Sequence, residues 1–217
     1  MRVVAIVVLS LLFTSAVEVR AQVSVGATLG QSGQGEGASD VPYLGPPFGG
    51  SSAAMLGMVD VALAPHVSIG GEMSLAGTIH GSQSQRAGFG VSNDFISEHR
   101  DNVFGGVVRF WTPDGEPVRA AVAVGAGVAQ RHTVRTGTTR SSFPPFTSTP
   151  FSDTLSDVVL AYTLGGDIVV RVTDRVGALA SGRVHRLRDD DRQPDGVVHR
   201  GVSSTIYRYG GGLQVRF

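Results

Sequence analysis

One segment decides the fold: Tyr207-Arg-Tyr-Gly-Gly-Gly-Leu-Gln-Val-Arg-Phe217. Its odd-numbered positions carry aromatic or aliphatic residues, with one glycine among them, whereas its even-numbered positions carry arginine, glutamine or glycine. A helix would place apolar residues three and four positions apart, but a strand with two different faces needs this period of two. The segment therefore predicts a β-strand with one apolar face and one polar or small face.

The same alternation recurs along the chain and defines eight predicted strands. They cover residues 22–30, 53–64, 67–77, 102–112, 118–131, 157–172, 176–187 and 204–217. Short connections with residues that favour chain reversal lie at 64–66, 113–117 and 173–175. Long connections rich in Gly, Ser and Pro lie at 31–52, 78–101, 132–156 and 188–203. Because short and long connections alternate, we expect all the long loops at one end of an antiparallel sheet.

Composition excludes several classes of protein. The 217 residues carry 18 basic side chains against 18 acidic ones, and this balance argues against a nucleic-acid binder that works through a basic field. The absence of cysteine excludes disulfide scaffolds and thiolate metal sites. No apolar run in the sequence reaches the roughly 18 to 20 residues that a transmembrane helix needs. With 41% hydrophobic and 17% charged residues, the chain is nevertheless apolar enough to fold.

The first 21 residues have the pattern of a secretory signal peptide. Arg2 precedes an apolar run from Val3 to Phe13, and the small residue Ala21 closes the segment. We expect cleavage after Ala21, which leaves residues 22–217 as one exported domain.

The two faces of the predicted strands indicate what surrounds them. Small residues crowd the polar face, as expected for a narrow barrel interior, and paired charges can lie among them. The apolar face is uncharged over most of each strand, and lipid tolerates eight such faces whereas water does not. A soluble, lipocalin-like periplasmic binding barrel, with its apolar face inside, is the alternative.

A closed barrel with this orientation holds charged side chains in its lumen. Eight strands enclose a space just wide enough for side chains to fill, so a salt-bridge plug is favoured over an ion path. Within it, Glu72 is expected to contact Arg109, Arg183 or Arg208. The full predicted lumenal network consists of Asp60, Glu72, Arg109, Asp167, Arg171, Arg183 and Arg208.

These features resemble the small eight-stranded outer-membrane β-barrels of Gram-negative bacteria, the class of OmpA-type and OmpX-type barrel domains. The likeness covers residues 22–217 and is carried by the segments 118–128, 163–175 and 210–217. It implies an all-β fold: an eight-stranded antiparallel up-and-down transmembrane β-barrel with long extracellular loops and short periplasmic turns. It also implies a monomer in the cell outer membrane, in contact with outer-membrane lipid and lipopolysaccharide.

The resemblance extends to the last predicted strand. In that family, a final strand that closes on phenylalanine, with aliphatic residues at alternate positions, is similar to the signal read by the barrel assembly machinery. The positions that match this pattern are Tyr209, Leu213, Val215 and Phe217.

For function, the sequence favours a non-enzymatic envelope protein that is structural or binds an extracellular partner through its four long loops. The six histidines are not spaced for a shared metal, and no Gly-x-Ser-x-Gly turn occurs, so no catalytic residue, metal or cofactor is predicted. An outer-membrane barrel enzyme acting on lipid and a narrow conduit stay open as alternatives. A Pro-Pro-Phe element recurs at 46–48 and 144–146, where it either stiffens a loop or docks onto a partner.

Overall fold

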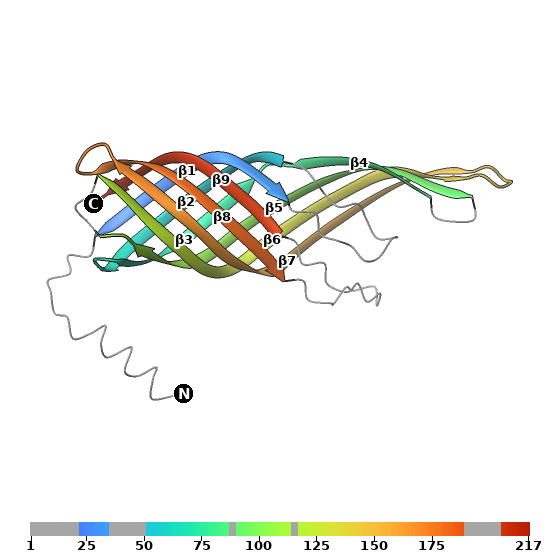
Figure 1. Ribbon diagram of the computed structural model, residues 1–217. Helices are drawn as coiled ribbons and strands as arrows, with labels where there is room; N and C mark the ends of the chain where they lie inside the picture. Colours follow the sequence, from blue (N-terminus) through green and yellow to red (C-terminus); the bar gives the residue numbers. More distant parts are fainter. Residues whose placement is uncertain (1–21, 35–50, 87–89, 114–116, 189–204) are drawn as a thin grey trace, which may run out of the picture.

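The computed structural model describes residues 22–34, 51–86, 90–113, 117–188 and 205–217 (Figure 1). The signal peptide predicted for residues 1–21 lies outside this set. In the described part, no helix is long and apolar enough to cross a membrane. The strands are β1 (Val23–Gln34), β2 (Ser51–Ala64), β3 (Val67–Ala76), β4 (Ile79–Arg86), β5 (Val91–Trp111), β6 (Val118–Ser141), β7 (Ser148–Arg171), β8 (Val176–Arg188) and β9 (Thr205–Arg216).

Eight of these strands form a closed ring. Each pairs antiparallel with its neighbours in chain order, and β1 also pairs with β9. The ring passes directly from β3 to β5, because β4 continues beyond the end of β3 and pairs with the upper part of β5. The predicted eight-stranded antiparallel barrel is therefore confirmed.

The strands are strongly staggered around the ring. Following paired residues from Val23 leads once around the barrel and returns to β1 at Gly33, ten residues further along. The intermediate members of this row are Val61, Ile69, Val108, Val124, Leu164, Val184 and Tyr207. Such a stagger tilts the strands by about 40° from the barrel axis. Apart from Gly33, the row is an apolar path around the outside of the barrel.

The apolar face of each strand points outward. Leu213 and Phe217 are 58% and 75% exposed, whereas Asp60 and Arg109 on the opposite face are 2% and 0% exposed. From Tyr207 to Phe217, the outward positions of β9 and the residue after it cover about 25 Å along the axis, at about 3.3 Å per residue and this tilt. An apolar band of that height is what a transmembrane β-barrel presents to lipid. The predicted orientation is confirmed.

The prediction of a long loop is wrong for two of the four segments. Residues 78–101 and 132–156 are mostly strand, because β4 and the extended ends of β5, β6 and β7 pair with one another up to Val91 and Ser141. In Figure 1 these four strands leave the ring and project together beyond its rim. The sequence concealed them because both faces of these segments are mostly polar, so the hydrophobic alternation fades. The predicted loops at 31–52 and 188–203 lie mostly outside the described residues.

The barrel interior is layered along its axis. An apolar cluster that includes Leu56, Met58 and Leu179 lies towards the short turns, with Trp111 packed against it. A second apolar cluster that includes Leu187 and Ile206 lies towards the projecting strands. The charged residues of the lumen lie between and beside these clusters.

Glycines permit close approach where β1 meets β9. A Cβ atom on Gly212 would collide with the backbone of Ala27 and Thr28, and one on Gly30 would collide with the backbone of Tyr209. Gly30 pairs with Gly210 directly across this seam. The glycine-rich segment of β9 therefore lets the first and last strands come together and close the ring.

Candidate functional site

Arg109 on β5 lies at the centre of the barrel and is surrounded by three carboxylates. Its Nη1 donates to Asp60 on β2, its Nη2 to Glu72 on β3, and its Nε to Asp167 on β7 at 3.0 Å. The curvature of the sheet brings these three strands around Arg109, and β3 also pairs directly with β5. The arginine side chain is fully buried, so its charge is balanced by these neighbours rather than by water.

Arg183 on β8 completes this cluster from the opposite wall. Its Nε donates to both carboxylate oxygens of Glu72, at 3.0 and 3.1 Å, and its Nη2 donates to Asp167 at 3.0 Å. Its Nη1 donates to the carbonyl oxygens of Gly166 and Gly182. Glu72 therefore contacts two arginines, Arg109 and Arg183, and the contact that the sequence predicted for it is present.

We call Asp60, Glu72, Asp167, Arg109 and Arg183 the central ion cluster. It joins five strands of the ring across the lumen. Its three carboxylates outnumber its two guanidinium groups, which leaves one formal negative charge. A further buried arginine nearby is therefore electrostatically favourable.

Arg208 on β9 supplies that charge in the next layer. Its guanidinium donates to the carbonyl oxygen of Ser74 at 2.6 Å, to the carbonyl oxygen of Asp101 at 2.5 Å and to the hydroxyl of Ser32 at 3.3 Å. It also donates to the Ser74 hydroxyl. Neutral acceptors thus hold Arg208, and it is not part of the central ion cluster.

Arg171 is a correction to the predicted network. Its side chain is exposed at the last position of β7, next to the short turn that leads to β8. Arg171 occupies an inward position in the alternation of β7, but it lies at the very end of the barrel. Water solvates its charge there, so it does not take part in the lumenal network.

A second polar group, which the sequence analysis missed, lies towards the projecting strands. His99 forms two hydrogen bonds: its Nδ1 lies 2.8 Å from the Thr133 hydroxyl, and its Nε2 lies 2.8 Å from a carboxylate oxygen of Asp101. Gln34 donates to the same carboxylate oxygen of Asp101 at 2.7 Å. The available signal was the continued alternation from Arg109 through Val103, which places residues 101 and 99 on the inner face.

The end of the lumen near the short turns holds another pair that was not predicted. The guanidinium carbon of Arg119 lies 5.0 Å from the centre of the Trp111 ring, in a cation–π arrangement. The Trp111 indole donates to the Ser68 hydroxyl at 2.9 Å. An aromatic ring and a buried arginine therefore pack together at this end of the barrel.

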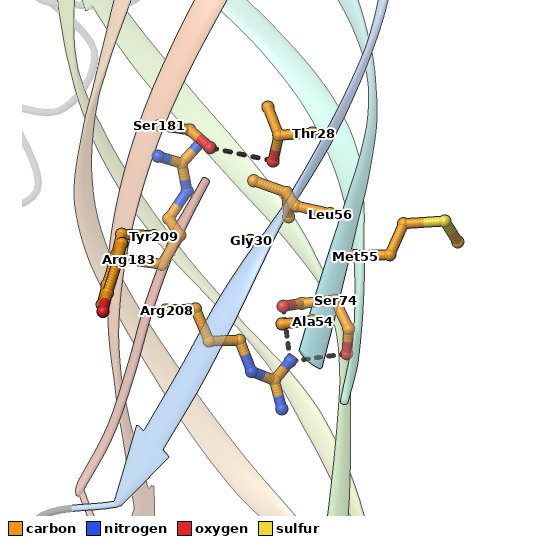
Figure 2. A pocket seen from close by; sticks show the side chains of 10 residues that line it. All are labelled: Thr28, Gly30, Ala54, Met55, Leu56, Ser74, Ser181, Arg183, Arg208 and Tyr209. Atoms are coloured by element: carbon orange, nitrogen blue, oxygen red, sulfur yellow. Dashed lines mark hydrogen bonds between the residues drawn. The ribbon is translucent and has the colours of Figure 1, made fainter. Parts of the chain in front are cut away.

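A small cavity separates Arg183 from Arg208 (Figure 2). Figure 2 shows Thr28 and Ser181 on one side of it, joined through their hydroxyls at 3.2 Å, and Ser74 bound to Arg208 on the other. Its volume is about 10 Å³, which is about the space that one water molecule needs. The cavity is far too small for a metabolite.

The four residues of the predicted assembly signal lie together on β9 and just after it. Tyr209, Leu213 and Phe217 are exposed on the outward face, and Val215 is half-buried on the same face. The Tyr209 hydroxyl donates to the Gln31 side chain of β1 at 2.8 Å. These residues thus border the seam at which the ring closes.

No family model matches the chain, and the search of curated proteins found no significant relative. Solved structures do match. OprG from Pseudomonas aeruginosa aligns with 91% of this chain and 96% of its own at a TM-score of 0.51 and 7% identity. Ail from Yersinia pestis aligns with 91% of this chain and 99% of its own at a TM-score of 0.46 and 14% identity. Neisserial surface protein A aligns with 90% of this chain and 97% of its own at a TM-score of 0.47 and 11% identity.

At these identities the likeness concerns the fold alone. The match to OprG extends over almost the whole of both chains. It agrees with the closed antiparallel ring described above. The chain has the fold of the small outer-membrane β-barrels.

Proposed function

We propose that this protein is a non-enzymatic, integral outer-membrane barrel that displays a binding surface outside the cell. The observation that carries the proposal is the four-stranded sheet that projects from one end of the ring (Figure 1). Loops and strands that extend from a rigid scaffold are where recognition residues concentrate. The ring supplies the membrane anchor, in contact with outer-membrane lipid and lipopolysaccharide, and the projecting sheet supplies the contact surface.

Strand β4 is the edge of this sheet that best suits binding. Within the described residues it pairs with β5 alone, and it contains no proline. A strand edge with unpaired backbone groups can accept an extended segment of another polypeptide. The opposite edge, on β7, carries Pro150, Asp153 and Asp157, which are residues that discourage strand addition.

The tip of the β6–β7 hairpin adds an apolar contact point. Phe143 and Phe146, which flank two prolines, are 57% and 77% exposed. This supports the binding interpretation of the Pro-Pro-Phe element over simple stiffening of a loop. The matching element at 46–48 lies outside the described residues.

Location and binding are tested with one shortened variant. Replacing residues 80–98 by an Asn-Gly turn would join Ile79 to His99, which already face each other across the hairpin. Both proteins should fractionate with the outer membrane and shift in gel mobility on heating. Peptides selected for binding to the full chain should bind the variant at least several-fold more weakly. Equal binding, or recovery of the full chain in the soluble periplasm, would contradict the proposal.

We also propose that the lumen is closed, which argues against the alternative of a conduit. The central ion cluster joins five strands across the lumen, and Trp111 packs with Arg119 at the short-turn end. In planar bilayers the refolded protein should show no steady conductance. Repeated unitary current steps from the unmodified chain would favour the conduit instead.

The outward residues of the last strand are proposed to guide assembly. Tyr209, Leu213, Val215 and Phe217 present an apolar edge beside the closing seam, which suits capture by the assembly machinery before the ring closes. Phe217→Ala should lower the folded yield in cells and leave refolding into lipid vesicles unchanged. Equal loss in both settings would indicate a purely structural role.

One arrangement among the described residues favours the enzyme alternative. Thr133, His99 and Asp101 form a hydroxyl–imidazole–carboxylate series like that of hydrolases. However, all three are buried, and Asp101 is shared with Gln34. We therefore interpret the series as a structural hydrogen-bond network. Lipid or ester hydrolysis by the refolded protein that is lost in His99→Ala would overturn this interpretation.

A further inference from the structure

The outward face of β8 changes character within one strand. Its burial alternates along the whole strand, which identifies the outward positions. From Val176 to Val184 these positions carry only aliphatic or small residues, and the next two are Arg186 and Arg188. The two arginines thus follow directly on the part of the strand that faces acyl chains.

Two tyrosines flank these arginines on the neighbouring strands. Tyr162 on β7 lies opposite Arg186, and Tyr207 on β9 lies opposite Val184, one outward position before Arg186. Both tyrosines are on the outward face and about half exposed. We call Arg186, Arg188, Tyr162 and Tyr207 the β8 rim site.

The position of this site along the barrel axis matches the headgroups of the outer leaflet. Val184 pairs with Tyr207, which ends the outward apolar band of β9 on the side of the projecting sheet. At the strand tilt given above, Arg186 and Arg188 lie about 5 and 10 Å beyond Val184, in the direction of the projecting sheet. Tyrosine is enriched at this level because its ring suits the acyl region and its hydroxyl suits the headgroups.

Among the described residues, the polar groups of the β8 rim site are not engaged by other side chains. In the part of the chain that the structure describes, no carboxylate lies within ion-pair distance of Arg186 or Arg188, and the phenols of Tyr162 and Tyr207 have no hydrogen-bond partner. The buried arginines of the lumen differ in this respect, because backbone, hydroxyl or carboxylate oxygens engage each of Arg109, Arg183 and Arg208.

We propose that the β8 rim site binds the phosphate groups of the anionic glycolipid that forms the outer leaflet. Guanidinium groups bind phosphate oxygens through paired, charge-assisted hydrogen bonds, and the phenols add two further donors. A lipid phosphate matches this site better than a soluble anion, because the site directly adjoins the apolar belt that would hold the acyl chains. The inference rests on the proposed location of the barrel in the outer membrane.

The test measures lipid binding to the refolded full chain in detergent, by native mass spectrometry. The probes are bisphosphorylated lipid A, the same lipid after phosphatase treatment, and inorganic phosphate. Combining Arg186→Gln with Arg188→Gln should lower the affinity for phosphorylated lipid A by roughly 10-fold or more. Tyr162→Phe with Tyr207→Phe should cause a smaller loss. Arg175→Gln, in the short turn at the opposite end of the barrel, is the matched control and should bind like the unmodified chain.

The heat-induced gel shift of each variant distinguishes loss of the site from loss of the folded barrel. A variant that shifts normally and binds weakly supports the site. A full chain that does not shift at all means that the proposed membrane barrel itself has failed. Unchanged binding by the double arginine variant overturns the β8 rim site, and so does equal binding of the dephosphorylated lipid. Displacement of the lipid by millimolar inorganic phosphate would reassign the site to small anions.

Discussion

Arg109 is the residue on which most of the lumenal charge depends, because three carboxylates from three strands converge on it. Removing one partner of a buried ionic group costs more than the group contributes, since the remaining charges stay buried and unpaired. We predict that Arg109→Met lowers the free energy of unfolding by about 3–5 kcal/mol. Urea unfolding in lipid vesicles, followed by the fluorescence of Trp111, the single tryptophan, measures this.

Two comparisons make the Arg109 prediction specific. Arg171→Met removes an exposed arginine from the same barrel and should change the stability by less than about 0.5 kcal/mol. Adding Asp60→Asn and Glu72→Gln to Arg109→Met should restore part of the loss, because fewer buried charges then lack a partner. A stability of Arg109→Met equal to that of the unmodified chain would show that the carboxylates are solvated.

At the level of the strand, closure of the ring depends on β9 approaching β1. The Cβ of Gly212→Ala would collide with the backbone of Ala27 and Thr28, which cannot move aside as a flexible side chain can. We predict that this variant loses about 1–3 kcal/mol of stability. Gly71→Ala is the control, because nothing lies within 4 Å of a Cβ at that position on β3. The heat-shifted fraction on gels, measured across a urea series, compares the two.

The control has an expected outcome of its own. Gly71→Ala should match the unmodified chain or exceed it by a few tenths of a kcal/mol, because alanine restricts the unfolded chain. If both alanine variants lose the same stability, the effect comes from alanine in a strand, and the seam between β1 and β9 is not specially tight.

At the scale of the whole molecule, the apolar outer surface forms a belt that faces lipid. The loss of stability caused by a charged residue on this belt depends on its depth in the membrane. Leu164 on β7 is an outward residue of the apolar row around the ring, whereas Val172 lies eight residues further on, just beyond the short-turn end of the same strand. We predict that Leu164→Arg loses about 2–4 kcal/mol of stability in lipid vesicles, and that Val172→Arg loses about 0–1 kcal/mol. Equal losses would show that the belt is not immersed as its position implies.

The alternating sequence determined the parts of the structure that depend on local pattern. A period of two fixes which residues share a face, so the outward positions from Tyr207 to Phe217 and the inward placement of Asp60, Glu72 and Arg183 followed from counting residues. The short turns at 64–66 and 173–175 followed in the same way, because turn residues interrupt the pattern there.

Only the tertiary structure decided which inward residues meet and where each lies along the barrel axis. Contacts across the lumen depend on the accumulated stagger of eight pairings, and no single segment encodes that sum. This is why Arg109 and Arg183 share Glu72 while Arg171, with the same alternation, remains in solvent at the rim. The projecting sheet also required the structure, because backbone pairing alone maintains strands whose two faces are both polar.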